Sequence, residues 1–152
     1  MNEIDWPRDA DWVWHGPLHD PSTWGKPGVV MTFNLECAGC ISRGVPFLKS
    51  LAAEHGERLE LAMLHTSYGR RKFPREQVEP QLLRFAASFA RLGLPIALDL
   101  SGEMAERWGA EGTPHWFVFD AAGRRVRSVY GSQDGARTRL SYLTQELLDA
   151  AA

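Results

Sequence analysis

Short apolar runs alternate along this chain with longer segments in which apolar residues recur every three to four positions. The runs are short, and several are rich in β-branched residues, as in buried strands. We expect strands at 12–14, 29–33, 59–64, 95–100, 116–119 and 125–130. The periodic segments predict helices at 41–55, from Pro80 to Gly93, at 102–108 and at 134–150. This order is typical of an α/β domain with a mixed sheet, because a tight turn joins the last two strands.

The longest stretch without apolar periodicity is the polar connection at 65–79. It contains the basic cluster Arg70-Arg71-Lys72, followed by Phe73-Pro74. We interpret this cluster as part of a solvated loop, because long surface loops are ordinarily charged. The alternative is that it attracts an acidic partner.

Length and composition describe an ordinary globular chain. The 152 residues are 44% hydrophobic and 24% charged, and no repeat or linker divides them, so we expect one domain over 1–152. The net charge of −2 gives no electrostatic reason to expect nucleic acid or an anionic membrane as a partner. Four of the six tryptophans precede Gly25, which predicts that the N-terminal segment packs against the domain.

The segment 1–9 is acidic and polar, and it lacks the basic and apolar regions of a secretory signal. No part of the sequence approaches the ~20 apolar residues that a membrane helix needs. For a full natural chain this pattern predicts a cytoplasmic protein with mostly reduced thiols. A mature fragment of an exported protein would have the same sequence.

The only two cysteines form the motif Cys37-Ala38-Gly39-Cys40, between the strand at 29–33 and the helix at 41–55. The unpaired N–H groups and the dipole at a helix start favour a thiolate, so Cys37 is predicted to be the nucleophile and a good leaving group. Cys40 lies one turn further along the helix. We expect it to be more buried and to act as the resolving thiol.

Two other interpretations of the cysteine pair are weaker. A coincidental pair of small buried residues would not require this position between a strand and a helix. A zinc site usually needs four ligands, and a second C-x-x-C is missing, while His15 and His19 stand in a proline-rich segment that is unsuited to a helix. We therefore expect no structural metal.

Other stretches of the chain extend the pattern around the cysteines. They are Gly25–Phe33, Val45–Leu48, Leu94–Asp99, Ala105–Gly109, Gly112–Asp120 and Gly123–Arg124. Together with the cysteine pair they resemble the thioredoxin superfamily, and most of all its disulfide reductases of the TlpA type. The resemblance covers approximately Trp12 to the C-terminus. It implies a thioredoxin-like α/β fold, in which helices flank a central mixed β-sheet with a short N-terminal strand extension.

The resemblance also implies a substrate-binding segment at Thr113 and Pro114. Pro114 would be cis and lie against the cysteine pair, leaving the Thr113 backbone to pair with a bound polypeptide. Without the resemblance, Pro114 would simply open a strand in trans. The implied activity is thiol–disulfide exchange without a cofactor. Its partners would be a disulfide-containing protein or small-thiol substrate and an upstream reductant.

Residues near the cysteines depart from the family pattern. Glu36 stands where many relatives have tryptophan, and its carboxylate would oppose thiolate formation, accept a proton during exchange, or lie on the surface. Arg43 would favour the thiolates if it reaches them, and is otherwise a helix-surface residue. No family proton acceptor carries over, because Met31 stands where thioredoxins keep a buried acid and Ser42 where TlpA-type reductases often have one.

Pro46 leaves the register of the helix at 41–55 open. A proline inside a helix should bend or restart it. Here Pro46 also falls one residue later, relative to Cys40, than in many relatives, with Gly44 in between.

The leading hypothesis is a thiol–disulfide oxidoreductase that works in the reducing direction. A peroxiredoxin-like peroxidase is less favoured, because Asn34 and Val30 stand near the positions where peroxiredoxins require threonine and proline. A third class is a non-catalytic binding module or copper(I) carrier, since copper(I) suits two thiolates. His65 or His115 would complete such a site only if the fold brings one close, and strand alternation directs His115 away from the thiols.

Overall fold

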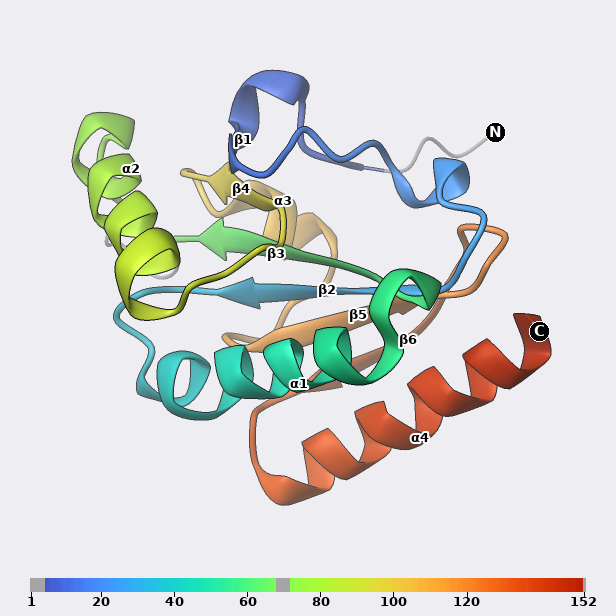
Figure 1. Ribbon diagram of the computed structural model, residues 1–152. Coiled ribbons are helices and arrows are strands. Elements are labelled where there is room, and N and C mark those ends of the chain that lie inside the picture. The colour runs from blue at the N-terminus through green and yellow to red at the C-terminus, as the bar shows by residue number, and fades with distance from the viewer. Residues whose placement is uncertain (1–4, 68–71, 152) are drawn as a thin grey trace.

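A six-stranded mixed sheet forms the centre of the molecule (Figure 1). The computed structural model describes residues 5–67 and 72–151, so Arg70 and Arg71 of the basic cluster lie outside the described residues. The strands are β1 (Trp12–Trp14), β2 (Gly28–Phe33), β3 (Glu60–Thr66), β4 (Ile96–Asp99), β5 (His115–Phe119) and β6 (Arg125–Tyr130). Their order across the sheet is β1-β4-β3-β2-β5-β6.

The three central strands β2, β3 and β4 are parallel, whereas β1, β5 and β6 run antiparallel to their neighbours. This arrangement confirms the predicted mixed sheet, and β1 is the predicted N-terminal strand extension at one edge. Because β2 lies between β3 and β5, its end is flanked by residues from both. The cysteines follow β2, so they are placed at this junction.

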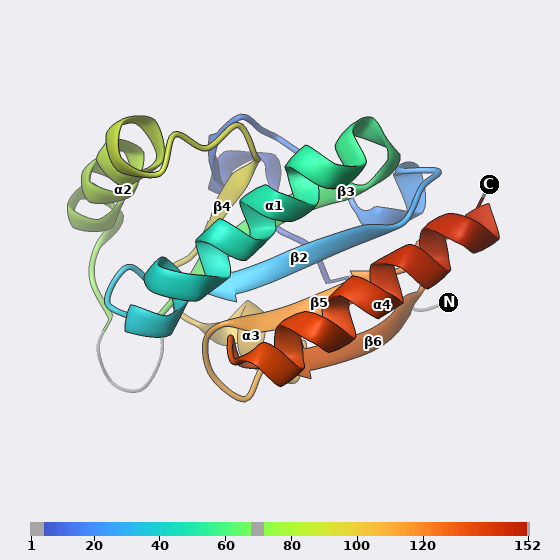
Figure 2. The ribbon, with the colours of Figure 1, turned by 60° about the horizontal axis from the view of Figure 1, so that its bottom comes forward.

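Helices cover the two faces of the sheet unequally (Figures 1 and 2). On one face α1 (Val45–His55) and α4 (Asp134–Ala151) lie side by side, with α2 (Arg75–Arg84) near the start of α1. The opposite face carries α3 (Glu103–Arg107) and the N-terminal segment. Shorter turns are 3-10 helices at Asp9–Asp11, Pro21–Thr23 and Gly56–Arg58, and π turns at Cys40–Gly44 and Phe85–Phe89. None of the helices in the described part of the chain combines the length and apolar composition that crossing a membrane requires.

Strand β2 contributes to both sides of the core because successive side chains point to opposite faces. Met31 and Phe33 pack with residues of the covering helices, including Leu48 of α1 and Leu140 of α4. We call this side the helical face. Val30 packs with a second cluster on the other side of the sheet.

The second cluster is built largely from tryptophan. The ring centroid of Trp6 lies 5.9 Å from that of Trp12, 5.7 Å from that of Trp24 and 5.9 Å from that of Trp108. The Trp6 Nε1 donates to the Leu18 carbonyl at 2.8 Å. These rings and Phe117 of β5, 5.3 Å from Trp108, define what we call the aromatic face. The N-terminal segment is thus packed against the sheet, as its tryptophans predict.

The prediction of a helix that begins at Pro80 is wrong. Helix α2 begins at Arg75 and contains Pro80, although proline cannot donate to the carbonyl four residues earlier. Burial of Val78 and Leu82 on the helical face and an ion pair between Arg75 and Glu79, at 2.6 Å, stabilise the turn before the proline. The helix then passes into a π turn and ends before Gly93.

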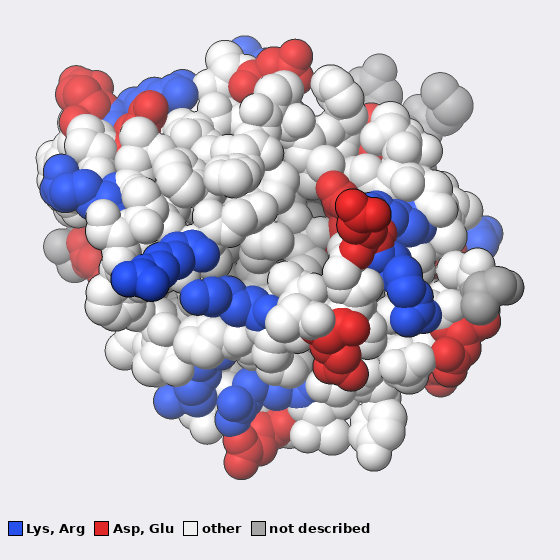
Figure 3. All heavy atoms as spheres, in the orientation of Figure 1, with Lys and Arg blue, Asp and Glu red and all other residues white. Residues whose placement is uncertain are grey.

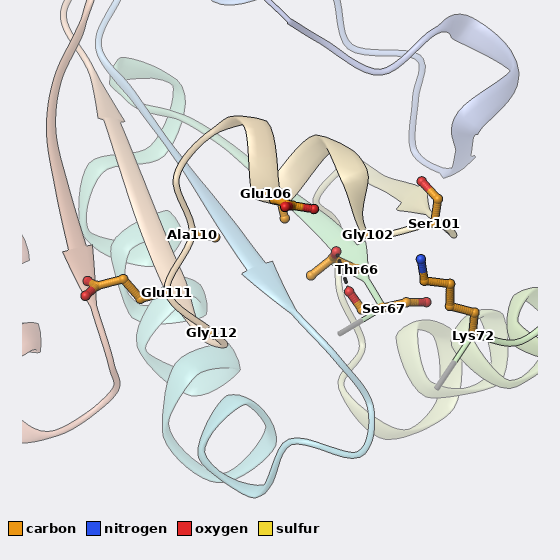
Figure 4. Close-up of a pocket in the computed structure, with 10 residues that line it drawn as sticks. Thr66, Ser67, Lys72, Ser101, Gly102, Glu106, Ala110, Glu111 and Gly112 are labelled. Atoms are coloured by element: carbon orange, nitrogen blue, oxygen red, sulfur yellow. Dashed lines mark hydrogen bonds between the residues drawn. The ribbon is translucent and has the colours of Figure 1, made fainter. Parts of the chain in front are cut away.

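Charged side chains of both signs occur on the face of the molecule that Figure 3 shows, and an uncharged area extends across its upper middle part. The pattern is that of a surface whose charges are mixed rather than gathered by sign. Lys72, the described member of the basic cluster, lies in the view of Figure 4 beside a pocket at the end of β3.

Candidate active site at the cysteine pair

Asn34 shapes the loop that carries Cys37 out of β2. Its side-chain amide donates to the Thr66 carbonyl at 2.8 Å, which ties the loop to the end of β3. Its Oδ1 accepts from the Glu36 N–H at 2.9 Å, and its main-chain carbonyl accepts from the Cys37 N–H at 3.0 Å. Sequence reasoning did not assign this role to Asn34. The available signal was an asparagine directly after a strand, a residue that often forms such side-chain turns.

Cys37 lies at the start of the helical segment, where its side chain acts as a cap. The Cys40 N–H points to the Cys37 Sγ at 3.2 Å, as it would to the side chain of an N-cap residue. The Cys37 Sγ is also 3.4 Å from the Thr113 carbonyl oxygen, to which a thiol donates. Cys37 is half-buried, and both cysteines are free thiols. The Cys37 sulfur thus lies between a helix N–H and a main-chain carbonyl oxygen.

Cys40 has a different environment. Its side chain is fully buried, and burial, followed by the hydrogen bond with Cys37, raises the pKa of its thiol to about 12. Cys37, Asn34 and Thr113 act on this thiol. Cys40 therefore remains a thiol at neutral pH until a base removes its proton. The two sulfurs are chemically unequal.

Thr113 and Pro114, which directly precede β5, lie next to Cys37. The Thr113–Pro114 peptide bond is cis, as the resemblance implies. Two hydrogen bonds hold this segment: the Gly131 N–H donates to the Pro114 carbonyl at 2.9 Å, and the Thr32 side-chain hydroxyl accepts from the His115 N–H at 3.2 Å. The Thr113 carbonyl is thereby directed to Cys37.

A π turn resolves the helix register that the sequence left open. The turn spans Cys40–Gly44 and is closed by the Val45 N–H on the Cys40 carbonyl, so it accommodates one residue more than an α-helical turn. Pro46 then falls in the first turn of α1, where proline is tolerated. Gly44 fits closely here, since a Cβ would stand 3.1 Å from the Met31 sulfur and would require that side chain to shift.

Arg43 and Glu36, the two candidates for tuning the thiols, point to different surroundings. The Arg43 Nε donates to the Ser132 hydroxyl at 3.1 Å, which links the π turn Cys40–Gly44 to the loop before α4. Ser132 also lies against Gly39, where a Cβ would be only 2.8 Å from its oxygen. Glu36 is exposed at the protein surface. Their influence on the thiols stays a prediction.

His65 and His115, the two histidines considered as copper(I) ligands, are buried and neutral. Burial lowers the pKa of His65 to about 4, and its Nε2 accepts from the Leu35 N–H at 3.3 Å. Burial also lowers the pKa of His115, whose ring stacks on Phe117 on the aromatic face at 4.7 Å. Within residues 5–67 and 72–151 no group of three His, Cys, Asp or Glu could hold a metal ion, so neither histidine joins the cysteines in one.

Among the hollows near the cysteine motif, two differ clearly in character. One is a groove of about 330 Å³ between the start of α1 and the end of α2. The other is a polar pocket of about 220 Å³ lined by the end of β3, by α3 and by the loop that precedes Thr113. Figure 4 shows Glu106, Glu111 and Lys72 around this pocket, and neither cysteine lines it.

Comparison with known proteins agrees with this geometry. No family model and no curated protein sequence matches the chain. A thiol-disulfide isomerase from Corynebacterium glutamicum is similar in structure, with a TM-score of 0.75, 25% sequence identity and 90% of each chain covered. A thioredoxin-like protein solved in its oxidised form has a TM-score of 0.73, with 17% identity over 92% of this chain and 89% of that one.

A secreted disulfide oxidoreductase of Mycobacterium tuberculosis is also similar, with a TM-score of 0.60 and 19% identity over 81% of this chain and 83% of that one. At identities this low, the last two likenesses show the fold. The architecture, the position of the cysteine pair and these similarities all indicate a thioredoxin-like fold.

Proposed function

We propose that this chain, a thioredoxin-like protein, is a thiol–disulfide oxidoreductase that works through the Cys37/Cys40 couple. The observation that carries the proposal is the inequality of the two sulfurs. Cys37 is half-buried and accepts a helix N–H, whereas Cys40 is fully buried and its pKa is raised to about 12. Such a pair divides the reaction between an accessible nucleophile and a protected resolving thiol.

In the reducing direction, the Cys37 thiolate attacks one sulfur of a substrate disulfide. The substrate S–S bond breaks, a Cys37–substrate disulfide forms, and one substrate sulfur leaves as a thiolate. Cys40 then loses its proton and attacks the Cys37 sulfur, which releases the second substrate sulfur. The substrate gains two electrons, and the protein is left with a Cys37–Cys40 disulfide. An upstream reductant restores the two thiols.

The proton of Cys40 needs an acceptor before the second step. We assign the role to the substrate thiolate released in the first step, which is formed beside the site. The Thr113 carbonyl accepts from Cys37 while that residue is a thiol, and the Cys40 N–H is directed to the sulfur that becomes the attacking thiolate. Thr113 and Pro114 would bind the substrate backbone beside the mixed disulfide. A cytoplasmic location would favour this reducing direction.

Reduction of insulin by dithiothreitol tests the proposal. We expect the wild-type protein to accelerate it and Cys37→Ser to abolish the acceleration. Reduced Cys40→Ser, mixed with insulin after the dithiothreitol has been removed, should instead accumulate a mixed disulfide between Cys37 and the substrate, visible by mass spectrometry. Equal rates for the wild type and Cys37→Ser would contradict the proposal. A reduction potential near the strongly oxidising limit of about −120 mV would contradict the reducing direction.

A further inference from the structure

An apolar groove begins beside the cysteine motif and is not used by the chemistry described above. One wall consists of Ile41 from the π turn Cys40–Gly44 and of Val45, Pro46 and Lys49 from α1. The other wall consists of Phe85 and Phe89 from the π turn that follows α2, and of Ala90 directly after it. The side chain of Phe89 is 74% exposed and stacks on Phe85, with ring centroids 5.6 Å apart. The Lys49 ammonium donates to the Ala90 carbonyl at 2.6 Å and joins the two walls.

The groove lies close to the candidate active site, because its wall begins at Ile41, the residue after Cys40. Ile41 is four residues after Cys37, and its N–H donates to the Cys37 carbonyl at 3.2 Å, so the two lie on the same side of the first helical turn. Val45 extends the same wall by a further turn. The groove therefore starts one helical turn from the nucleophilic sulfur and leads away from it.

The groove and the Thr113–Pro114 segment lie on opposite sides of Cys37. Strand β2, which delivers Cys37, has β3 on one side and β5 on the other. Helix α2 follows β3, whereas Thr113 and Pro114 lead into β5. Figure 2 shows α2 and the start of β5 on either side of the beginning of α1. A polypeptide whose cysteine is bonded to Cys37 would therefore contact Thr113 on one side and the groove on the other.

Both walls of the groove contain a departure from α-helical geometry. Ile41 belongs to the π turn Cys40–Gly44, and Phe85 and Phe89 belong to the π turn Phe85–Phe89. Such turns are frequent at functional sites. A single exposed aromatic residue is ordinary on a protein surface, but here it forms the wall of a concave apolar site that adjoins a reactive thiol.

We propose that this groove binds an apolar side chain of a disulfide-containing polypeptide, so that the substrate is a protein rather than a small thiol compound. The inference rests on the proposed function and specifies its substrate class. Lys49 is the charged residue of the lining, and no acidic residue accompanies it. The occupant is therefore an aliphatic or aromatic side chain near the substrate cysteine, flanked by neutral or acidic residues rather than basic ones.

Two disulfide-bridged peptides that differ only in leucine or glycine at one position near the cysteine provide the test, with 5,5′-dithiobis(2-nitrobenzoate) as a small disulfide. We expect the wild type to reduce the leucine peptide with a higher kcat/KM than the glycine peptide. Phe89→Ala should lower kcat/KM for the leucine peptide about tenfold, in keeping with the loss of much of one buried apolar contact. Its rate with the small disulfide should remain that of the wild type.

Tyr142→Ala is the matched control, since Tyr142 on α4 is an aromatic residue with the same 74% exposure. It should change none of the three rates. Equal kcat/KM values for the two peptides, or a Phe89→Ala variant as fast as the wild type on the leucine peptide, would overturn the groove proposal alone. A wild-type protein that reduces none of the three compounds would overturn the proposed function as well.

Discussion

The two faces of the sheet are covered by different means. The helical face is packed by α1, α2 and α4, and its cluster includes Met31, Leu48 and the fully buried Cys40. The aromatic face carries the short helix α3 and an N-terminal segment whose Trp12 and Trp24 pack around Trp6, while Trp108 at the end of α3 stacks on Trp6. The same strand, β2, supplies alternate side chains to both.

We infer that the two faces have different roles, one in stability and the other in the reaction. A helix that starts at the end of a strand offers free N–H groups at a defined point, and on the helical face that point is occupied by Cys37. An irregular segment offers no such point, but large rings cover much of a sheet with few residues. We therefore expect changes on the aromatic face to affect stability and changes around the cysteines to affect the reaction.

The strongest test of this division is Trp108→Ala on the aromatic face. Trp108 is 8% exposed, packs on Trp6 and Phe117, and donates from Nε1 to the Asp5 carbonyl at 2.7 Å. Removing a buried tryptophan should lower the free energy of unfolding by about 3–5 kcal/mol, measured by chemical denaturation. The rate of disulfide reduction per folded molecule should be unchanged.

Trp108→Phe serves as the control, because it keeps a ring in the cluster and should lose less stability. If Trp108→Ala slowed disulfide reduction per folded molecule as strongly as it weakens the fold, the two faces would not be separate in function.

A second prediction concerns buried His65 on the helical face. Its folded-state pKa of about 4 is below the ordinary value of 6.5, so between these pH values the unfolded chain binds a proton that the folded chain does not. Stability should thus be fully present above pH 6.5 and fall as the pH decreases toward 4, by about 3 kcal/mol for this group. Denaturation curves from pH 7 to pH 4 measure the decrease.

His65→Gln should flatten this dependence, because glutamine keeps an acceptor for the Leu35 N–H but does not titrate. His115, whose pKa burial also lowers, would contribute to the slope that remains. An equally steep loss of stability in His65→Gln would show that His65 does not cause it.

The smallest expected effect on stability is that of Asn34→Ala beside the cysteines. The variant loses the hydrogen bonds of Asn34 to Thr66 and Glu36, which together correspond to about 1–2 kcal/mol. Because these bonds hold the loop that positions Cys37, disulfide reduction should slow several-fold even in fully folded protein. Denaturation and an insulin assay on the same preparation measure both quantities.

Asp20→Ala provides a matched control for this prediction. The Asp20 side chain accepts from the Ser22 N–H at 3.0 Å in a comparable turn of the N-terminal segment. It should lose similar stability without slowing the reaction. Equal slowing in both variants would mean that Asn34 acts only through general stability.

Much of the fold and the centre of the site could be predicted from the sequence. Apolar periodicity indicated the strands and most helices, because each element shows its buried face as a local repeat. The position of Cys37 and Cys40 between a strand and a helix was likewise a local feature. The roles of Thr113, Pro114, Glu36 and Arg43 were expected from the family resemblance or from chemistry, and stay predictions.

What local patterns could not indicate depended on contacts between distant segments. β3 continues through His65 and Thr66, two polar residues that are buried by their neighbours. α2 begins before Pro80 because packing of Val78 and Leu82 compensates for the lost hydrogen bond. In both cases tertiary packing outweighed the local preference of the residue.

The sequence by itself thus determined which elements form and that a pair of cysteines stands at the start of one helix, since periodicity and capping act within a few residues. The tertiary structure decided how that dithiol is supported: the bond from Asn34 to Thr66, the full burial of Cys40, and the groove that Phe89 forms with Ile41. Each of these depends on residues that are far apart in the chain or on the surroundings that packing creates. Their proximity follows from packing of the whole domain, which no single stretch of sequence encodes.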